Sequence, residues 1–394
     1  MQLTPEDKLI LSCIKIHPTT TELEQLNSFI PFIPDWEVLT NNLIDRGIGP
    51  LLFNKLPQLP NSPLIPSVQR TKLQQTYYKT FSRSTILYEY FRKVIEAFTA
   101  GNINVIALKG IYLSEWLYQD IGLRQFSDID LLVKEEDGDK CVKLLMEMGY
   151  KPRISNQVSE FISAKSDFVH YSPMELNNVS VEIHIKLHMN GLKFHLLMDE
   201  VWQNAEPVIV NKVAVKTLDT NDLLIHLCIH LHKHFQGGHV QFTCFNDITN
   251  LLEKYAENFN WSEFELQCRK YNCVEEVFKY LVLVNKYFNA AVPKYIIEKH
   301  ETLLDEKEEE LFYKYLHGYS FEQANKSAIP VHINNLKQLR KFTDLTKYFI
   351  DLMFPPKKFM LDKYKINHQG LYMFYYPYRW WVGAKGLLKL IIKN

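Results

Sequence analysis

The chain has 394 residues, which is long enough for two or three packed domains. Its 46% hydrophobic and 23% charged residues are typical of folded globular proteins and exclude a disordered or collagen-like chain. The 45 Lys and Arg balance 45 Asp and Glu, whereas a protein that coats nucleic acid needs an excess of basic residues. We therefore expect no nucleic-acid partner.

The six cysteines are scattered and form no CxxC pair, which predicts buried thiols in a reducing compartment. Charged residues interrupt the first 20 positions, so the pattern is not that of a signal peptide. No segment has the roughly 18 uninterrupted apolar residues of a membrane span. The sequence therefore predicts a cytoplasmic protein.

Residues 1–100 are predicted to form a helical N-terminal region. Apolar residues recur at i, i+3 and i+4 over 9–14 and again over 88–98, as on the buried face of a helix. Prolines between 57 and 66 interrupt this pattern and predict a loop between the two stretches.

The pattern changes in residues 101–218, which are predicted to form an α/β core. The run 105–108 predicts a strand that turns at Lys109-Gly110 into a helix over 111–118. A second strand over 129–133 precedes a helix over 137–148 that ends at Gly149. Two hairpins are expected, one pairing 168–172 with 179–187 through Asn177-Asn178 and one pairing 208–210 with 213–215.

Residues 219–394 are predicted to form a helical C-terminal region. The helices expected here cover 223–234, 247–255, 274–288 and 336–352. The acidic stretch 301–310 indicates a solvated helix face before a loop near 318–329. The whole pattern predicts an α+β fold in which helical regions flank a mixed β-sheet.

Two aspartates on one strand are the first candidates for chemistry. Asp128 and Asp130 are separated by one apolar residue, so their side chains point to the same face, about 7 Å apart along the strand. Hard carboxylates in this arrangement suit Mg²⁺, whose octahedron substrate phosphates can complete. The pattern is short, and a polar strand face that happens to carry two aspartates is the alternative.

Neighbouring residues favour the metal interpretation. Lys109-Gly110 lies between a strand and a helix, where backbone can approach a phosphate near the helix N-terminus. Glu182 and His184 share one face of the strand over 179–187. If that strand pairs beside 129–133, three acids meet and can hold two metal ions.

These motifs resemble the bacterial uncharacterised nucleotidyltransferase family, within the DNA polymerase β-like nucleotidyltransferase superfamily. The resemblance rests on Leu-Lys-Gly at 108–110, Ser-Asp-Ile-Asp-Leu-Leu-Val at 127–133, Val-Glu-Ile-His at 181–184 and the helical signature over 223–248. It implies a nucleoside triphosphate substrate, two Mg²⁺ ions, Asp128 and Asp130 as catalytic metal ligands, and Glu182 as the third carboxylate. The nucleoside monophosphate would pass to a small-molecule, saccharide or peptide acceptor.

The sequence departs from the superfamily at two points. Lys109-Gly110-Ile111 replaces the usual Gly-Ser step, and 17 residues separate Gly110 from Asp128. Arg124 can compensate by binding phosphate through its planar fork, or it can form a structural ion pair. The departures leave a second hypothesis open, a catalytically inactive nucleotide-binding protein of the same fold.

A row of histidines supports a third hypothesis. His226, His230 and His234 recur every four residues along one helix face, and Asp247 follows. Such a set can hold a metal in a His/Asp phosphohydrolase, although the chain has neither a His-Asp dipeptide nor HExxH. We favour packing or an acceptor-site role, with His184, His230, His234 and Asp247 beside the nucleotide.

The C-terminal segment is basic and aromatic. Residues 350–394 contain eight Lys or Arg against two Asp, a net charge of +6, together with seven aromatic residues between 372 and 381. Such a helix can lie on an anionic membrane, which predicts a weak surface contact through 371–394. The alternative is a terminal segment docked on the protein with its lysines in solvent.

Overall fold

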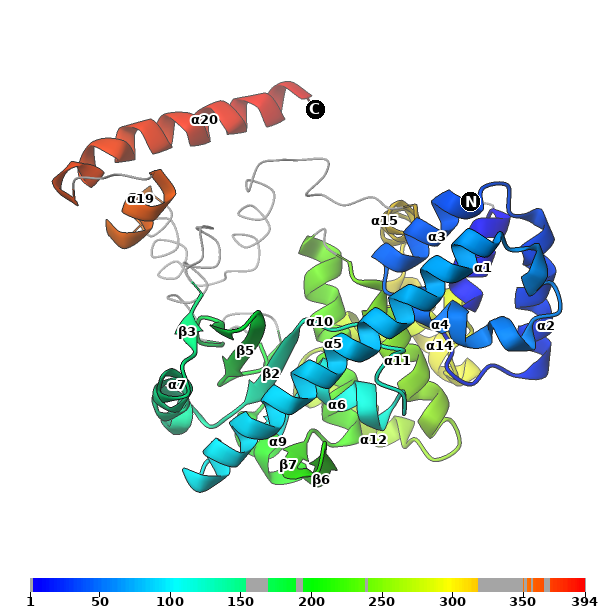
Figure 1. Cartoon of the computed structure of the whole chain (residues 1–394), viewed down its shortest axis with the longest axis horizontal. Coiled ribbons are helices and arrows are strands. Elements are labelled where there is room, and N and C mark those ends of the chain that lie inside the picture. Colours follow the sequence, from blue (N-terminus) through cyan, green and yellow to red (C-terminus); the bar gives the residue numbers. More distant parts are fainter. Residues whose placement is uncertain are drawn as a thin grey trace.

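The computed structural model describes residues 3–153, 169–188, 194–237, 240–317, 350, 353–355, 357–364 and 369–393. The described chain forms an α+β fold in which helical regions flank one mixed sheet, as predicted (Figure 1). None of its described helices is both long and apolar enough to cross a membrane. All six cysteines are free and buried, which confirms the prediction of buried thiols.

The N-terminal region is helical, as expected. Its helices are α1 (Pro5–Ser12), α2 (Thr20–Phe29), α3 (Trp36–Asp45), α4 (Gly49–Lys55) and α5 (Ser67–Ala100). Helices α1 and α2 begin with capping boxes built on Thr4 and Thr19, which satisfy the first backbone N–H groups. The proline-rich stretch forms two short 3₁₀ turns before α5.

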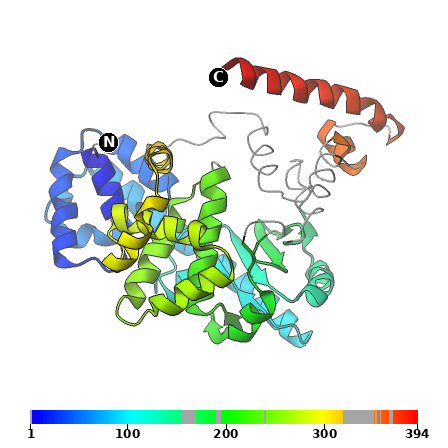
Figure 2. The same ribbon diagram turned by 180° about the vertical axis from the view of Figure 1, so that it is seen from behind.

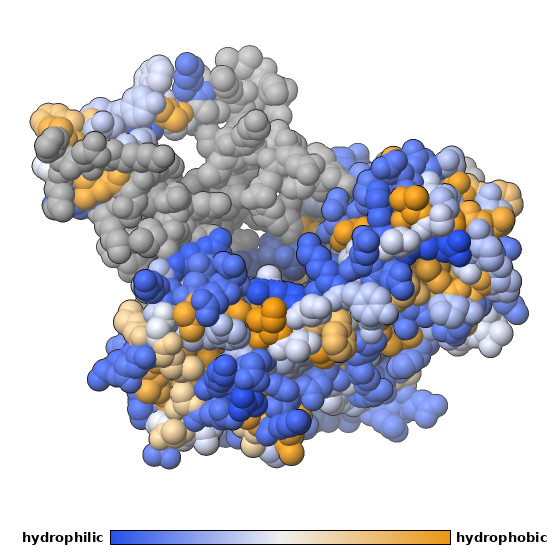
Figure 3. All heavy atoms as spheres, in the orientation of Figure 1, coloured by the Kyte–Doolittle hydropathy of each residue, from blue (hydrophilic) through white to orange (hydrophobic). Residues whose placement is uncertain are grey.

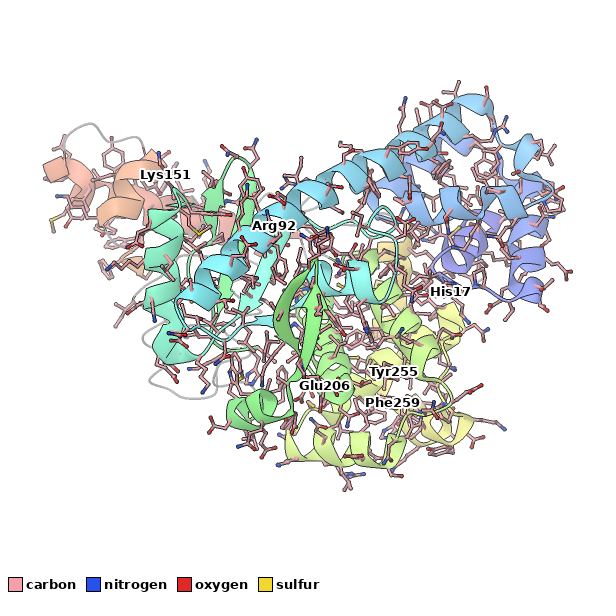
Figure 4. The ribbon with its side chains drawn as sticks, turned by 60° about the horizontal axis from the view of Figure 1, so that its bottom comes forward. His17, Arg92, Lys151, Glu206, Tyr255 and Phe259 are labelled. Atoms are coloured by element: carbon pink, nitrogen blue, oxygen red, sulfur yellow. The ribbon has the colours of Figure 1, made fainter. Side chains whose placement is uncertain are left out.

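The long helix α5 spans the molecule. It packs on α3 and α4 at its start and on β2, β7 and α7 farther along (Figure 1). Figure 4 places Arg92 of α5 between His17, in the N-terminal helices, and Lys151, at the edge of the sheet. The helix therefore connects the N-terminal region to the core.

The core is a seven-stranded sheet of order β3-β4-β5-β2-β1-β7-β6. Pairing is parallel between β2 and β5 and between β1 and β7, and antiparallel elsewhere. The strands are β1 (Ile106–Ala107), β2 (Asp128–Leu132), β3 (Lys151–Pro152), β4 (Met174–Leu176), β5 (Val179–His184), β6 (Glu206–Val210) and β7 (Val213–Thr217). The helices among them are α6 (Lys109–Trp116), α7 (Gly138–Glu147) and α9 (Met198–Asn204).

Local turn chemistry fixes both hairpins. Asn177-Asn178 and Asn211-Lys212 all have positive φ, as a two-residue turn between twisted strands requires. Gly149 ends α7 with a φ of 94°, as predicted. The first hairpin differs from expectation in one strand, because β4 is Met174–Leu176 rather than 168–172. A tight two-residue turn pairs the residues nearest to it. The predicted stretch still pairs at the far end of β5, where His170 forms an isolated bridge to His184, Tyr171 N–H donates to Ile183 O and Ile185 N–H donates to Val169 O.

The C-terminal region is again helical. It contains α10 (Thr220–Gly237), α11 (Phe242–Tyr255), α12 (Trp261–Lys270), α13 (Val274–Phe288), α14 (Lys294–His300), α15 (Glu306–Leu316), α19 (Lys357–Tyr364) and α20 (Tyr375–Lys393). Figure 2 shows α10–α15, green to gold, between the sheet and the N-terminal helices, with α19 and α20 lying apart. The helix predicted over 336–352 and the loop predicted near 318–329 fall outside the described residues, apart from Ile350.

The acidic stretch 301–310 is only partly the solvated face that we expected. Its residues form a 3₁₀ turn and the start of α15. Glu308 is largely buried and lies 2.8 Å from Lys279 Nζ on α13, so this acid holds α15 against α13. A charge that has a partner on a neighbouring helix can be buried, and composition alone does not show that partner.

Candidate active site

The carboxylates predicted to act together project from two neighbouring strands. β2 and β5 are parallel, and their register places Asp130 beside Glu182 and Asp128 beside Ser180. Alternate residues of a strand share a face, so Asp128, Asp130, Glu182 and His184 lie on the same side of the sheet. The intervening residues Ile129, Leu131, Val181 and Ile183 are fully buried in the core on the other side.

Three of these side chains form a compact group of potential metal ligands. One ligand atom each from Asp130, Glu182 and His184 lies within 4.8 Å of the others. His184 Nε2 is 2.9 Å from Asp130 Oδ1, in a hydrogen bond in which the ring N–H donates, and 3.7 Å from Glu182 Oε2. The histidine therefore orients Asp130 while the second oxygen of Asp130 faces another partner.

That partner is Lys109, the first residue of α6. Its Nζ lies 3.1 Å from Asp130 Oδ2, and both side chains are largely buried. The backbone of Lys109 has a φ of 46°, a left-handed conformation that costs a non-glycine residue about 1–2 kcal/mol. This backbone conformation positions a long basic side chain among carboxylates.

The neighbouring charges shift the pKa values of Asp128 and Asp130 in opposite directions. Burial, together with the negative charges of Asp130 and Glu182, raises the pKa of Asp128 to about 7. Burial would also raise the pKa of Asp130, but the charge of Lys109 and the hydrogen bond from His184 outweigh it and hold that pKa well below its usual range. Burial lowers the pKa of His184 to about 4, so the ring is neutral at pH 7.

Helix α10 carries histidines near the cluster of carboxylates and Lys109. It stands beside β2 and β5 in both ribbon views (Figures 1 and 2). Burial and then the charge of Lys109 lower the pKa of His226 to about 3 and that of His230 well below its usual range. The rings of His230 and His234 lie 4.4 Å apart. The predicted histidine row therefore places the neutral rings of His226 and His230 near Lys109.

Lys233 is a site residue that the sequence analysis missed. Burial of its ammonium group and the charge of Lys109 lower its pKa, whereas the charges of Glu182 and Asp130 oppose that shift. The side chain is nevertheless exposed along much of its length. Its position three residues after His230 puts it on the same helix face, and this spacing is the signal that could have identified it.

Buried His226 carries an unused polar atom. The residue is 4% exposed, and its Nε2 has no hydrogen-bond partner among the residues that the structure describes. Buried polar atoms of native proteins nearly always have a partner, so an orphaned one points to a missing water or ligand group. This atom marks the α10 side of the site as a place where a ligand can bind.

Arg124 and Asp247 form a buried ion pair with each other. Arg124 Nε and Nη2 donate to the two oxygens of Asp247 at 2.8 and 2.6 Å, and Tyr118 Oη donates to Asp247 at 2.9 Å. Arg124 is 7% exposed and Asp247 1% exposed. The Arg124 guanidinium group, predicted to bind phosphate, thus points to α11. The Asp247 carboxylate, predicted to lie with the histidines, is bound by Arg124.

The turn at Gly110 is too crowded for a side chain. A Cβ at this position would lie 2.6 Å from Phe126 Cβ and 2.8 Å from Arg124 Nη1. Real Cβ atoms do not approach other atoms this closely, so only glycine fits without a shift of its neighbours. The ion pair with Asp247 therefore holds Arg124 directly behind the beginning of α6.

One family model matches more than half of the chain. The model of a family described as "Uncharacterised nucleotidyltransferase" matches residues 34–289. No curated protein matches the chain. Among solved structures, the solution structure of the antibiotic-resistance factor ANT(2'')-Ia is 8% identical, with a TM-score of 0.35, over 52% of this chain and 99% of that one.

Proposed function

The chain belongs to the uncharacterised nucleotidyltransferase family, and we propose that it moves a nucleoside monophosphate from a nucleoside triphosphate to an acceptor with the help of Mg²⁺. The observation that carries this proposal is the group of carboxylates Asp128, Asp130 and Glu182 on two parallel strands in register. Such a group on rigid strands can hold divalent cations that bind triphosphate oxygens.

The donor set fits magnesium. Three carboxylates supply the hard oxygen ligands that Mg²⁺ prefers, and their mutual repulsion, seen in the raised pKa of Asp128, is relieved by a divalent cation. Asp128, Asp130 and Glu182 would hold two ions when nucleotide is bound, while His184 fixes the orientation of Asp130. Bound Mg²⁺ would neutralise the triphosphate and stabilise the charge that develops at the α-phosphorus.

Basic groups on the other side of the site would bind the triphosphate. Lys109, at the beginning of α6, and Lys233, on α10, both interact electrostatically with Asp130, so both ammonium groups lie at the site. The first N–H groups of α6 at Lys109-Gly110 add a favourable place for an anion. We assign Arg124 to positioning, because its ion pair with Asp247 holds it against Gly110.

The acceptor would bind against α10. His230 is a neutral ring that can both donate and accept a hydrogen bond, and the His234 ring lies beside it, which suits a hydroxyl-bearing small molecule, saccharide or peptide. The orphaned Nε2 of His226 supplies one more polar contact on this face. The attacking acceptor oxygen forms the new P–O bond as pyrophosphate leaves.

Two measurements test the proposal. Nucleotide binding is followed by calorimetry with and without Mg²⁺, and transfer of α-labelled nucleotide is followed to sugar-phosphate, small-molecule and peptide acceptors. We expect Mg²⁺-dependent binding that Asp128→Asn and Asp130→Asn abolish and that Glu175→Gln, a carboxylate change on neighbouring β4, leaves intact. Binding that needs no metal and ignores both aspartate changes, together with no transfer, would exclude the proposal.

Lys109 gives the inactive alternative one specific observation in its favour. Its ammonium group already neutralises Asp130 without any metal, and the segment Lys109-Gly110-Ile111 has no serine hydroxyl to bind a phosphate. A protein that binds nucleotide but transfers none in the same assays would support that alternative. Arg124 binds both oxygens of Asp247, so the phosphohydrolase hypothesis gains no comparable support.

A further inference from the structure

Helix α20 exposes a face of apolar and aromatic side chains. Phe374, just before the helix, is 75% exposed, Tyr378 52%, Trp381 59% and Val382 46%. The spacing of these residues places them along one side of a helix. Figure 3 shows hydrophobic side chains on the surface of this C-terminal segment, in the upper left of the view.

The opposite side of α20 is already used for packing. Tyr376 Oη donates to Pro355 O at 2.6 Å, and Trp380 Nε1 donates to Met353 O at 2.8 Å. Phe354 packs edge-on against the Trp380 ring, with 5.3 Å between the ring centroids. The residues around 353–355 therefore anchor one face of the helix. On the other face, the Tyr378 ring contacts Tyr364 of α19 with 5.9 Å between the centroids, but Tyr378 and Trp381 both remain more than half exposed.

The charge of this segment has one sign. Residues 363–394 contain six Lys or Arg and no Asp or Glu, although the whole chain is neutral. Lys385 Nζ lies 4.8 Å from the centroid of the Trp381 ring, so a cation accompanies the exposed aromatic surface. Tryptophan and tyrosine with neighbouring lysines are typical of helices that lie at the boundary between lipid headgroups and acyl chains.

We propose that α20 docks this protein on an anionic phospholipid bilayer, with Phe374, Tyr378, Trp381 and Val382 in the interface and Lys385 at the headgroups. The helix lies on the surface and does not cross it, since no described helix is apolar enough to span a bilayer. The charge decides for a bilayer over a second copy of the chain, because two such basic segments would repel each other. This inference is independent of the proposed activity.

The test uses the full-length protein in vesicle sedimentation. We expect binding to vesicles that contain about one third phosphatidylglycerol, loss of binding to pure phosphatidylcholine, and weakening when ionic strength rises to about 0.5 M. The Tyr378→Ser/Trp381→Ser variant and the Lys385→Glu/Lys389→Glu variant should each bind at least about tenfold more weakly. Thermal unfolding checks that both variants keep the wild-type fold.

A matched control changes the same residue types elsewhere. Tyr295 and Lys294 on α14 are also exposed, so Tyr295→Ser/Lys294→Glu should bind vesicles like the wild type. The proposal is overturned if the wild type ignores anionic vesicles or if the α20 variants bind as well as the control. Self-association without vesicles that the α20 variants abolish would instead assign this face to a second copy of the chain.

Discussion

Lys109 Nζ lies 3.1 Å from Asp130 Oδ2, so the cluster of three carboxylates already contains a cation that the chain itself supplies. The charges of Asp130, Asp128 and Glu182 all raise the pKa of Lys109, against the effect of burial. A Mg²⁺ ligand oxygen lies about 2.1 Å from the ion, so an ion bound to this oxygen would compete with the ammonium group for it. Metal binding and the position of Lys109 are therefore linked.

Lys109→Met should destabilise the metal-free protein and increase its response to metal. Removing the ammonium group leaves buried Asp130 without its cation and with only the hydrogen bond from His184, at a cost of about 1–3 kcal/mol in the free energy of unfolding. Thermal unfolding in chelator and in Mg²⁺ measures both effects, and the stabilisation by Mg²⁺ should exceed that of the wild type. Lys93→Met on the exposed side of α5 is the control. An unchanged response to Mg²⁺ would show that Lys109 and the ion do not compete.

The two aspartates of β2 should behave oppositely in the absence of metal. Asp130→Asn removes the partner of Lys109 and His184 and should lower stability, whereas Asp128→Asn relieves repulsion and should raise stability by about 1–3 kcal/mol at pH 8. Denaturant unfolding in chelator separates the two effects. Changes of the same sign for both variants would contradict the charge arrangement described above.

Gly110→Ala should disturb the beginning of α6. The new Cβ would overlap Phe126 and Arg124, and relief of such an overlap typically costs 1–3 kcal/mol, about the cost of overpacking a core. We expect a lower unfolding temperature and weaker nucleotide binding. Gly383→Ala on α20, where a Cβ meets no atom within 4 Å, is the matched control. Equal behaviour of the two variants would mean that the turn adapts easily.

Arg124→Ala should lower the free energy of unfolding strongly, because it leaves the buried Asp247 carboxylate without its cationic partner. Breaking a buried pair by removing one partner costs about 3–5 kcal/mol. Asp247→Asn in the same chain should recover part of the loss, and a double-mutant cycle from unfolding free energies measures the coupling. A coupling energy near zero would show that the two residues are not energetically linked.

Asp222 should make stability depend on pH. Burial and the neighbouring charge of Asp219 raise the pKa of Asp222 to about 7. The folded state thus favours the protonated carboxyl, so the contribution to stability is complete below about pH 4 and is lost as the pH rises through 7. Asp222→Asn should therefore stabilise the protein by about 1–3 kcal/mol at pH 8 and by much less at pH 5. Exposed Glu257→Gln should show no such pH dependence.

Features governed by local rules could be predicted from the sequence. The turns at Asn177-Asn178 and Asn211-Lys212, the cap at Gly149 and the helix carrying the histidine row follow from neighbouring residues, and the structure contains all of them. The alternation in β2 likewise gave the shared face of Asp128 and Asp130. These patterns involve residues only a few positions apart.

Features that depend on distant residues could not be predicted. The register of β2 on β5 places Asp130 beside Glu182. From the sequence, this contact could be predicted only if the two strands were assumed to pair. Arg124 and Asp247 are 123 positions apart, so the sequence left open whether Arg124 binds phosphate or a carboxylate. The position of the Lys109 ammonium group among the carboxylates depends on a left-handed backbone conformation that lysine rarely adopts.

The long connection between Gly110 and Asp128 is tethered rather than slack. Tyr77 Oη of α5 donates to Asp120 at 3.0 Å, Arg124 is bound to Asp247 of α11, and Arg83 of α5 donates to Ser127 O at 3.3 Å. Arg83 also donates to Asn178 O at 2.7 Å, next to the beginning of β5. Arg83 thus binds the residues that directly precede β2 and β5, the two strands that carry the carboxylates. The extra length of this connection therefore does not change the distance between the acids.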